Sequence, residues 1–178
     1  MRSDSDILLE LAARKSAGTL VANDAYLKGD TTPLADSIVD AESRLGFHLP
    51  PLLASVYRDV SNGGFGDSYG FLGLVGGPLN EDGMDAISLY EANRESDPND
   101  EYWYWPEGLI PICHLGCAMY HCVQCGNADA EVVWFEPNPH EDEEPWDDSF
   151  IPFCSTFSEY LSAWLDDVDL WAKLKNGA

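Results

Sequence analysis

The chain has 178 residues, the length of one ordinary domain, and its 45% hydrophobic and 12% aromatic residues are enough for a folded core, which excludes a disordered protein. Nine Lys and Arg stand against 32 Asp and Glu, so the formal net charge is −23. A field of that sign repels nucleic-acid phosphates and anionic lipid, so we expect no nucleic-acid and no membrane partner. The same field attracts basic partners; the alternative is that the charge only keeps the protein soluble.

The first residues carry neither the apolar core nor the cleavage site of a signal peptide, and no apolar run reaches the roughly 18 residues of a membrane span. We therefore expect a cytoplasmic protein. Its five cysteines are an odd number, and in a reducing compartment they are expected as free thiols.

The chain opens with an amphipathic helical pattern. Asp4 or Ser5 is the expected N-cap, and the helix runs to about Lys15 before Gly18 ends it. The buried face of this helix would hold Ile7, Leu8, Leu11 and Ala12. A short turn is expected over Asn23–Lys28. Residues 1–30 are thus a helical extension of a single domain, 31–178.

A second helix is predicted with Thr32 as N-cap and Pro33 at the first helical position, and Gly46 would stop it. Its buried stripe would hold Leu34, Ile38, Ala41 and Leu45.

The stretch "LGFHLPPLLASVYRDVSNGG" then predicts a third helix. Pro50 and Pro51 fit its first turn, and apolar residues repeat with helical spacing up to Val60. Asn62, Gly63 and Gly64 are expected to form its C-cap and a turn, because glycine adopts positive φ without steric cost. Gly46, Pro50, Asn62, Gly63 and Gly64 are our candidate structural motif.

The middle of the chain reads as short strands. Strands are predicted at Phe71–Leu74, Leu109–Cys113, Met119–Gln124 and Val132–Phe135, whereas "ISLYEANRES" is open to being one short helix. A last helix has Thr156 and Glu159 spaced as a capping box and an apolar stripe from Phe157 to Trp171. Helices, then strands, then a helix indicate an α+β fold.

With these elements placed, the chain resembles the SMI1/KNR4 family of the SUKH superfamily. The resemblance is carried by "ESRLGFHLP", "LLASVYRDVSNGG", "GLIPICHLGCAMYHCVQC" with "EVVWFEPN", and "TFSEYLSAWL", over roughly Asp36 to Trp171. The cysteine-containing portion is similar to a bacterial subset of the family.

The resemblance implies a curved mixed or antiparallel sheet of about four to six strands, packed against N-terminal helices and a C-terminal helix. It also implies protein binding without catalysis. Bacterial members are similar to immunity proteins that neutralise polymorphic toxins, often basic nucleases, and eukaryotic members are regulatory adaptors. No catalytic residue and no cofactor carries over.

The sharpest alternative is a zinc site, since thiolate and imidazole are zinc ligands. The cysteines have the spacing C-x3-C-x4-C-x2-C, which lacks two compact C-x-x-C knuckles. The candidate ligands are Cys113, Cys117, Cys122 and Cys125. The competing interpretation is that these small thiols fill a buried hairpin. A nucleophilic pair of Cys113 and His114 is disfavoured, because neighbours in a strand face apart.

Two acidic segments are our candidates for contact with a basic partner, and aromatic residues beside them are the candidate anchors. If "EYWYWPEG" is extended, its two tryptophans share one side and its two tyrosines the other, so one pair packs on the sheet. The alternative is that these aromatics mainly close the core. The candidate partner-binding residues are Tyr69, Asp97, Asp100, Glu101, Trp103, Trp105, Glu141, Asp142, Glu143, Glu144, Trp146, Asp147 and Asp148.

The sequence therefore predicts an intracellular, non-enzymatic binding protein, with an immunity protein against a basic toxin as the leading hypothesis. A regulatory adaptor and a zinc-binding module remain the alternatives. The oligomeric state is left open.

Overall fold

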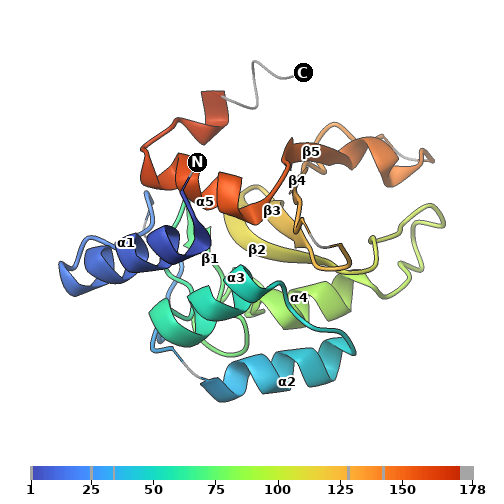
Figure 1. The fold of residues 1–178 in the computed structure, drawn as a ribbon. Coiled ribbons are helices and arrows are strands. Elements are labelled where there is room, and N and C mark those ends of the chain that lie inside the picture. The colour runs from blue at the N-terminus through green and yellow to red at the C-terminus, as the bar shows by residue number, and fades with distance from the viewer. Residues whose placement is uncertain (1, 25, 34, 128, 142, 173–178) are drawn as a thin grey trace.

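The computed structural model describes residues 2–24, 26–33, 35–127, 129–141 and 143–172. Its elements in chain order are α1 Asp4–Ser16, α2 Ala35–Leu45, α3 Pro51–Ser55, the π-helical turn η1 Val56–Val60, β1 Gly70–Phe71, α4 Ala86–Asn93, β2 Leu109–Gly116, β3 Met119–Gln124, β4 Val132–Phe135, the 3-10 turn η2 Trp146–Ser149, β5 Phe150–Cys154 and α5 Phe157–Leu165. Helices precede the sheet and a helix follows it (Figure 1), so the predicted α+β class is confirmed.

The strands form one antiparallel sheet in the order β1-β2-β3-β4-β5, so every strand pairs with its neighbours in sequence. Cys117 and Ala118 connect β2 to β3 with φ angles of 51° and 59°. Two left-handed residues in succession suit a tight hairpin, because they match the twist of the paired strands. Helix α4 packs against β2, and α5 packs against β5, α1 and α3.

Helix α1 is joined to the core by its apolar face and by basic residues within it and just before it. Ile7 and Leu11 are fully buried. The Arg2 guanidinium donates to the Ser162 carbonyl (3.1 Å), the Arg14 guanidinium donates to the Leu165 carbonyl (2.6 Å), and the Lys15 ammonium donates to the Val60 carbonyl. These carbonyls belong to the last turns of α5 and η1, where a positive charge is favoured.

The ends of the first two helices differ from the prediction. Ser3 caps α1 in place of Asp4 or Ser5, because its hydroxyl accepts from the Asp6 amide and the Asp6 carboxylate accepts in return. Ala12, expected on the buried face, is exposed. Helix α2 begins at Ala35, two residues after the predicted start, and Leu34 lies outside the described residues. In the predicted turn Asn23–Lys28, Asn23 and Asp24 form a bend and Lys28 forms a bridge to Leu79, whereas Ala25 lies outside the described residues.

The third helix is confirmed, although its second half, Val56–Val60, is π-helical. Pro50 is its N-cap residue. The Asn62-Gly63-Gly64 motif does not cap this helix as expected. The C-cap is Ser61 in an extended conformation, and the motif instead binds a distant segment.

The Asn62 side chain is buried and makes three hydrogen bonds to the segment after β1. Its Oδ1 accepts from the Leu74 amide (2.8 Å), and its Nδ2 donates to the carbonyls of Val75 and Gly76 (3.2 Å each). Gly63 has a φ of +85°, and a Cβ there would lie 2.5 Å from the Leu72 carbonyl oxygen. The Gly64 amide donates to the Phe71 carbonyl (2.8 Å). The motif therefore ties the end of η1 to the first edge of the sheet.

Strands β3 and β4 have the predicted bounds, and helix α4, capped by the Asp85 side chain, covers the first seven residues of "ISLYEANRES". Strand β1 is shorter than predicted, because the Gly73 amide donates to the Pro78 carbonyl (2.7 Å) instead of to a neighbouring strand. Strand β2 continues three residues further, to Gly116. Strand β5 was not predicted, since Pro152 interrupts its pattern, but β5 is an edge strand, where proline is tolerated.

The last helix is shorter than its apolar stripe suggested. Thr156 caps α5 by accepting from the Glu159 amide, and the Glu159 carboxylate accepts from the Ser155 amide. The helix ends at Leu165, Asp167 has a left-handed φ of 53°, and Val168 is 47% exposed. The chain therefore turns before Trp171 instead of continuing one helical face.

Candidate functional site

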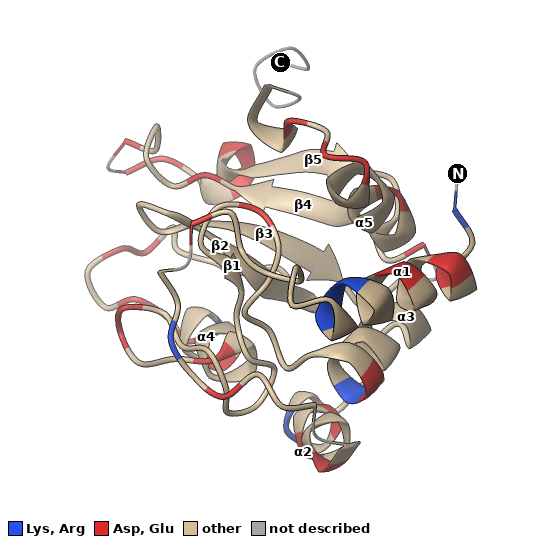
Figure 2. Ribbon diagram, turned by 90° about the vertical axis from the view of Figure 1, so that its left-hand side faces the viewer, with Lys and Arg blue, Asp and Glu red and all other residues tan. Residues whose placement is uncertain are grey.

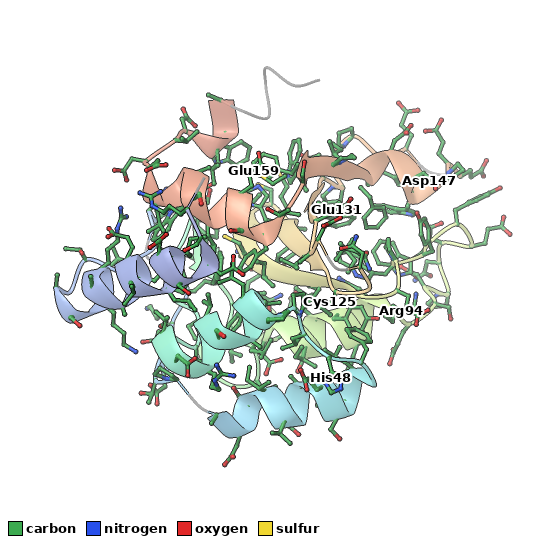
Figure 3. All side chains as sticks on the ribbon, viewed as in Figure 1. His48, Arg94, Cys125, Glu131, Asp147 and Glu159 are labelled. Carbon is green, nitrogen blue, oxygen red and sulfur yellow. The ribbon has the colours of Figure 1, made fainter. Side chains whose placement is uncertain are left out.

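The two predicted acidic segments meet in space. They are the loop from α4 to β2 and the loop from β4 through η2 to β5, and both extend on the right of Figure 1. The Trp146 indole Nε1 donates to Asp100 Oδ2 (2.7 Å) and thereby joins the two loops. A second link runs from the Tyr104 hydroxyl to Asp147 Oδ1 (3.3 Å). Figure 3 labels Asp147 on one of these loops and Arg94 at the base of the other.

An open cleft of about 640 Å³ lies between the loops. We call it the acidic cleft, and its lining residues are Pro98, Asn99, Asp100, Glu101, Tyr102, Pro137, His140, Glu143 and Trp146. Three of these side chains are carboxylates and none is Lys or Arg. The cleft is thus anionic and aromatic at once.

Asp100 organises its own loop as well as the link. Its Oδ1 accepts from the Tyr102 amide (2.9 Å), and its backbone carbonyl accepts from the Trp103 amide (3.2 Å). The hydrogen bond from Trp146, together with these backbone amides, lowers the pKa of the Asp100 carboxyl below its usual value. Asp100 is therefore a fixed, ionised carboxylate.

Trp146 is the centre of the aromatic wall. The His140 ring stacks on it with centroids 3.6 Å apart, and Trp103 meets it edge-on at 4.9 Å. Trp103 is half-buried and its indole Nε1 donates to the Asn93 carbonyl (3.0 Å). Trp146 thus rests on Trp103, which is itself packed against the core.

The prediction that one aromatic pair of "EYWYWPEG" packs on the sheet is confirmed. Trp105 is 1% exposed and its Nε1 donates to the Leu109 carbonyl (2.7 Å), whereas Tyr102 and Tyr104 are each 41% exposed. Trp105 accordingly closes the core, and in this conformation it offers no surface to a partner. The tyrosines, which were not among the candidate residues, are the exposed pair.

The remaining candidates divide by location. Most of the acidic ones are exposed on the two loops around the acidic cleft: Asp97, Glu101, Glu141, Glu143, Glu144, Asp147 and Asp148. Asp142 lies outside the described residues. Tyr69 is not in the acidic cleft. It precedes β1, stacks on Tyr26 (4.5 Å) and packs against His114 (5.2 Å).

Sequence reasoning missed His140, although a signal was present. Its ring lies six positions before Trp146 in a segment bounded by Pro139 and Pro145, so the two rings could be expected to face each other across a short loop.

The cysteine residues do not assemble into a ligand set. Within the described ranges, no group of three or more His, Cys, Asp or Glu side chains is placed to hold a metal ion. Cys113 and Cys122 are fully buried in the sheet, and Cys117 is exposed in the hairpin turn. Burial raises the pKa of the Cys113 and Cys122 thiols, and it raises that of Cys125 to about 12. These three thiols are consequently poor nucleophiles and poor metal ligands at neutral pH.

The described helices include none with the length and apolar character needed to cross a bilayer. Acidic residues are distributed along the ribbon over the helices and loops, and few basic residues accompany them (Figure 2).

Comparison with known sequences gives one informative match. The sequence model of the SMI1 / KNR4 family (SUKH-1) matches residues 32–163. This range is more than half of the chain and includes α2 to β5 and most of α5. No curated protein sequence matches this chain significantly.

Proposed function

This chain belongs to the SMI1 / KNR4 family (SUKH-1), a family of generally non-enzymatic domains with roles in protein binding, including immunity. From that premise we propose that it is a cytoplasmic immunity protein: it binds a basic toxin domain, such as a nuclease, and blocks the access of substrate to it. The observation that carries the proposal is the hydrogen bond from Trp146 to Asp100, which joins two acidic loops into one anionic, aromatic surface.

The charge of the surface supports a basic partner. Carboxylates on both loops face solvent around the acidic cleft, and the whole chain has a net charge of −23. Such a field accelerates encounter with a cationic protein and discriminates against anionic ones. Screening acts over about 8 Å at physiological ionic strength, so association should slow as salt is added.

Affinity needs desolvated anchors in addition to charge. Tyr102 and Trp146 line the acidic cleft, Tyr104 bonds to Asp147 on the second loop, and both tyrosines are 41% exposed. Tyrosine and tryptophan bury large areas with little loss of side-chain entropy, which makes them favoured anchors in interfaces. The mechanism we propose is therefore occlusion of the toxin active site. The carboxylates attract the toxin, and the aromatic side chains hold the two proteins together so that this chain covers the active site of the toxin.

The test begins with affinity capture from the native host, followed by mass spectrometry and co-expression with the captured protein. We expect a basic partner whose toxicity is suppressed. Capture of a partner that is bound but not neutralised would favour the regulatory adaptor over the immunity protein.

The second step locates the surface. The triple variant Glu101→Gln/Glu143→Gln/Asp147→Asn should slow association about tenfold at low salt. The matched control, Asp36→Asn/Asp40→Asn/Asp82→Asn, removes the same charge from exposed positions of α2 and of the loop before α4, and it should change the rate much less. Equal effects of both variants would show that the acidic cleft is not the contact surface.

A further inference from the structure

A second, smaller cavity lies where the chain turns after α5. It measures about 260 Å³, and we call it the Asp67 pocket; its lining residues are Asn23, Asp67, Trp164, Asp167, Val168, Asp169, Leu170 and Trp171. The turn lies at the upper left of Figure 1, whereas the loops of the acidic cleft extend on the right. The two cavities share no lining residue.

Asp67 is a buried acid that lacks a countercharge. The residue is 6% exposed, and its Oδ1 accepts one hydrogen bond from Asn23 Nδ2 (2.9 Å). Among the residues that the structure describes, no Lys, Arg or His lies within ion-pairing distance of it. Burial raises the pKa of the Asp67 carboxyl; hydrogen bonds from the Ser68 amide and from Asn23 oppose this effect in part, and the nearby Asp169 carboxylate adds to it. A buried carboxylate in this situation is stabilised when a cation enters.

The rest of the pocket favours a cation too. Asp167 and Asp169 line it together with Asp67, so three carboxyl groups face one small cavity. Two indole rings, Trp164 and Trp171, complete the wall.

Both indoles are held in place. Trp171 Nε1 donates to the Ser68 hydroxyl (3.0 Å), and the Trp171 ring meets the Trp134 ring edge-on at 6.4 Å. Trp164 already carries one guanidinium, because the Arg14 Cζ lies 5.4 Å from its ring centroid. The rings are thus positioned for cation–π contact, and one of them makes such a contact within the chain.

We infer that the Asp67 pocket binds a guanidinium group, in the form of an arginine side chain from a protein partner. The volume is below the roughly 300–1,000 Å³ of pockets for drug-sized ligands and suits one side chain. A planar guanidinium pairs with a carboxylate through two parallel hydrogen bonds and stacks on an indole, which an ammonium does less well. A free arginine is disfavoured because its own carboxylate would meet three aspartates.

The pocket is a feature of this chain more than of its family. Asn23 and every lining residue from Trp164 onward lie outside the family-matched residues 32–163, and only Asp67 lies inside. The inference therefore does not depend on the proposed immunity function.

The experiment is a titration with the blocked peptide acetyl-Gly-Arg-Gly-amide at constant ionic strength, monitored through the indole N–H signal of Trp171 by NMR. We expect a saturable shift, with weaker binding for acetyl-Gly-Lys-Gly-amide and for free arginine. Asp67→Asn keeps the shape of the side chain and should weaken binding at least tenfold. Asp40→Asn, which removes one exposed charge from α2, should change it less than twofold.

Trp171→Phe provides an independent arm should Asp67→Asn disturb the fold, and with the Asn23 side-chain amide as the reporter it should also weaken binding. Tighter binding of free arginine than of the blocked peptide would overturn the assignment to a protein partner, because the pocket would then be a site for the free amino acid. No saturable shift at Trp171, a shift confined to Trp146, or equal weakening by Asp67→Asn and Asp40→Asn would overturn the inference.

Discussion

Gly63→Ala tests the close approach between the Asn62-Gly63-Gly64 motif and the sheet. A Cβ at Gly63 would lie 2.5 Å from the Leu72 carbonyl oxygen and 2.6 Å from that of Phe71, so the backbone itself would have to shift. Gly46 is the matched control, because its φ of +77° is close to the +85° of Gly63 and a Cβ there meets nothing within 4 Å.

The expected sizes follow from these contacts. The left-handed conformation costs alanine about 1–2 kcal/mol, and the less flexible unfolded chain offsets about 0.4–1 kcal/mol of this, so Gly46→Ala should lower the free energy of unfolding by about 1 kcal/mol. Gly63→Ala adds an overpacking cost of roughly 1–3 kcal/mol, for a total of about 2–4 kcal/mol.

Urea unfolding, followed by tryptophan fluorescence, measures both variants against the parent chain. Gly64→Ala should fall between them, because the one close contact of its Cβ would be the Thr31 side-chain methyl, at 2.5 Å, which can rotate away, while Pro78 lies at an ordinary 3.6 Å. Equal losses for Gly63→Ala and Gly46→Ala would refute the reasoning, since conformation alone would then account for both.

Three other outcomes are expected. Asn62→Ala should lower the free energy of unfolding in urea by about 2–4 kcal/mol, because it leaves the buried Leu74 amide without its acceptor. Burial lowers the pKa of His114, so below the unfolded-state pKa of about 6.5 the unfolded chain takes up a proton that the native chain does not. The free energy of unfolding should therefore fall as the pH drops from 7 toward the lowered native pKa. The variant His114→Gln should show a smaller dependence of the urea midpoint on pH. Leu11→Ala should lower the unfolding free energy by about 2–5 kcal/mol, whereas Leu9→Ala, at a position 70% exposed, should stay within about 0.5 kcal/mol; similar values for the two would mean that α1 does not contribute to the core.

The elements that the sequence predicted well are those with local signals. The Thr156 cap and the helical repeat of Pro51–Val60 act within a few residues, and both appear in the structure, although the second half of that helix is π-helical. Strand β5 was missed because Pro152 is a local signal against a strand, and only its position at the sheet edge makes that proline acceptable.

The candidate site shows the same division. Acidic and aromatic residues could be identified from composition along the chain, but the bond between Trp146 and Asp100 spans 46 positions and depends on how two loops leave the sheet. The burial of Trp105 and the separation of Tyr69 from the acidic cleft also depend on tertiary packing. The sequence predicted Asn62 as part of a helix cap because that is a local role. Its hydrogen-bond partners lie twelve to fourteen positions further along the chain, where no local pattern indicates them.

The carbonyl-binding role of Arg2, Arg14 and Lys15 has a consequence for the behaviour of the molecule in concentrated solution. The chain has only nine Lys and Arg, and these three are turned inward onto the ends of α5 and η1. Three more, Arg44, Arg58 and Arg94, bond to groups of the chain itself. Among the described residues this leaves Lys28 to pair with the carboxylates of a neighbouring copy, so identical molecules should keep one another at a distance, and a partner has to bring the neutralising charge with it.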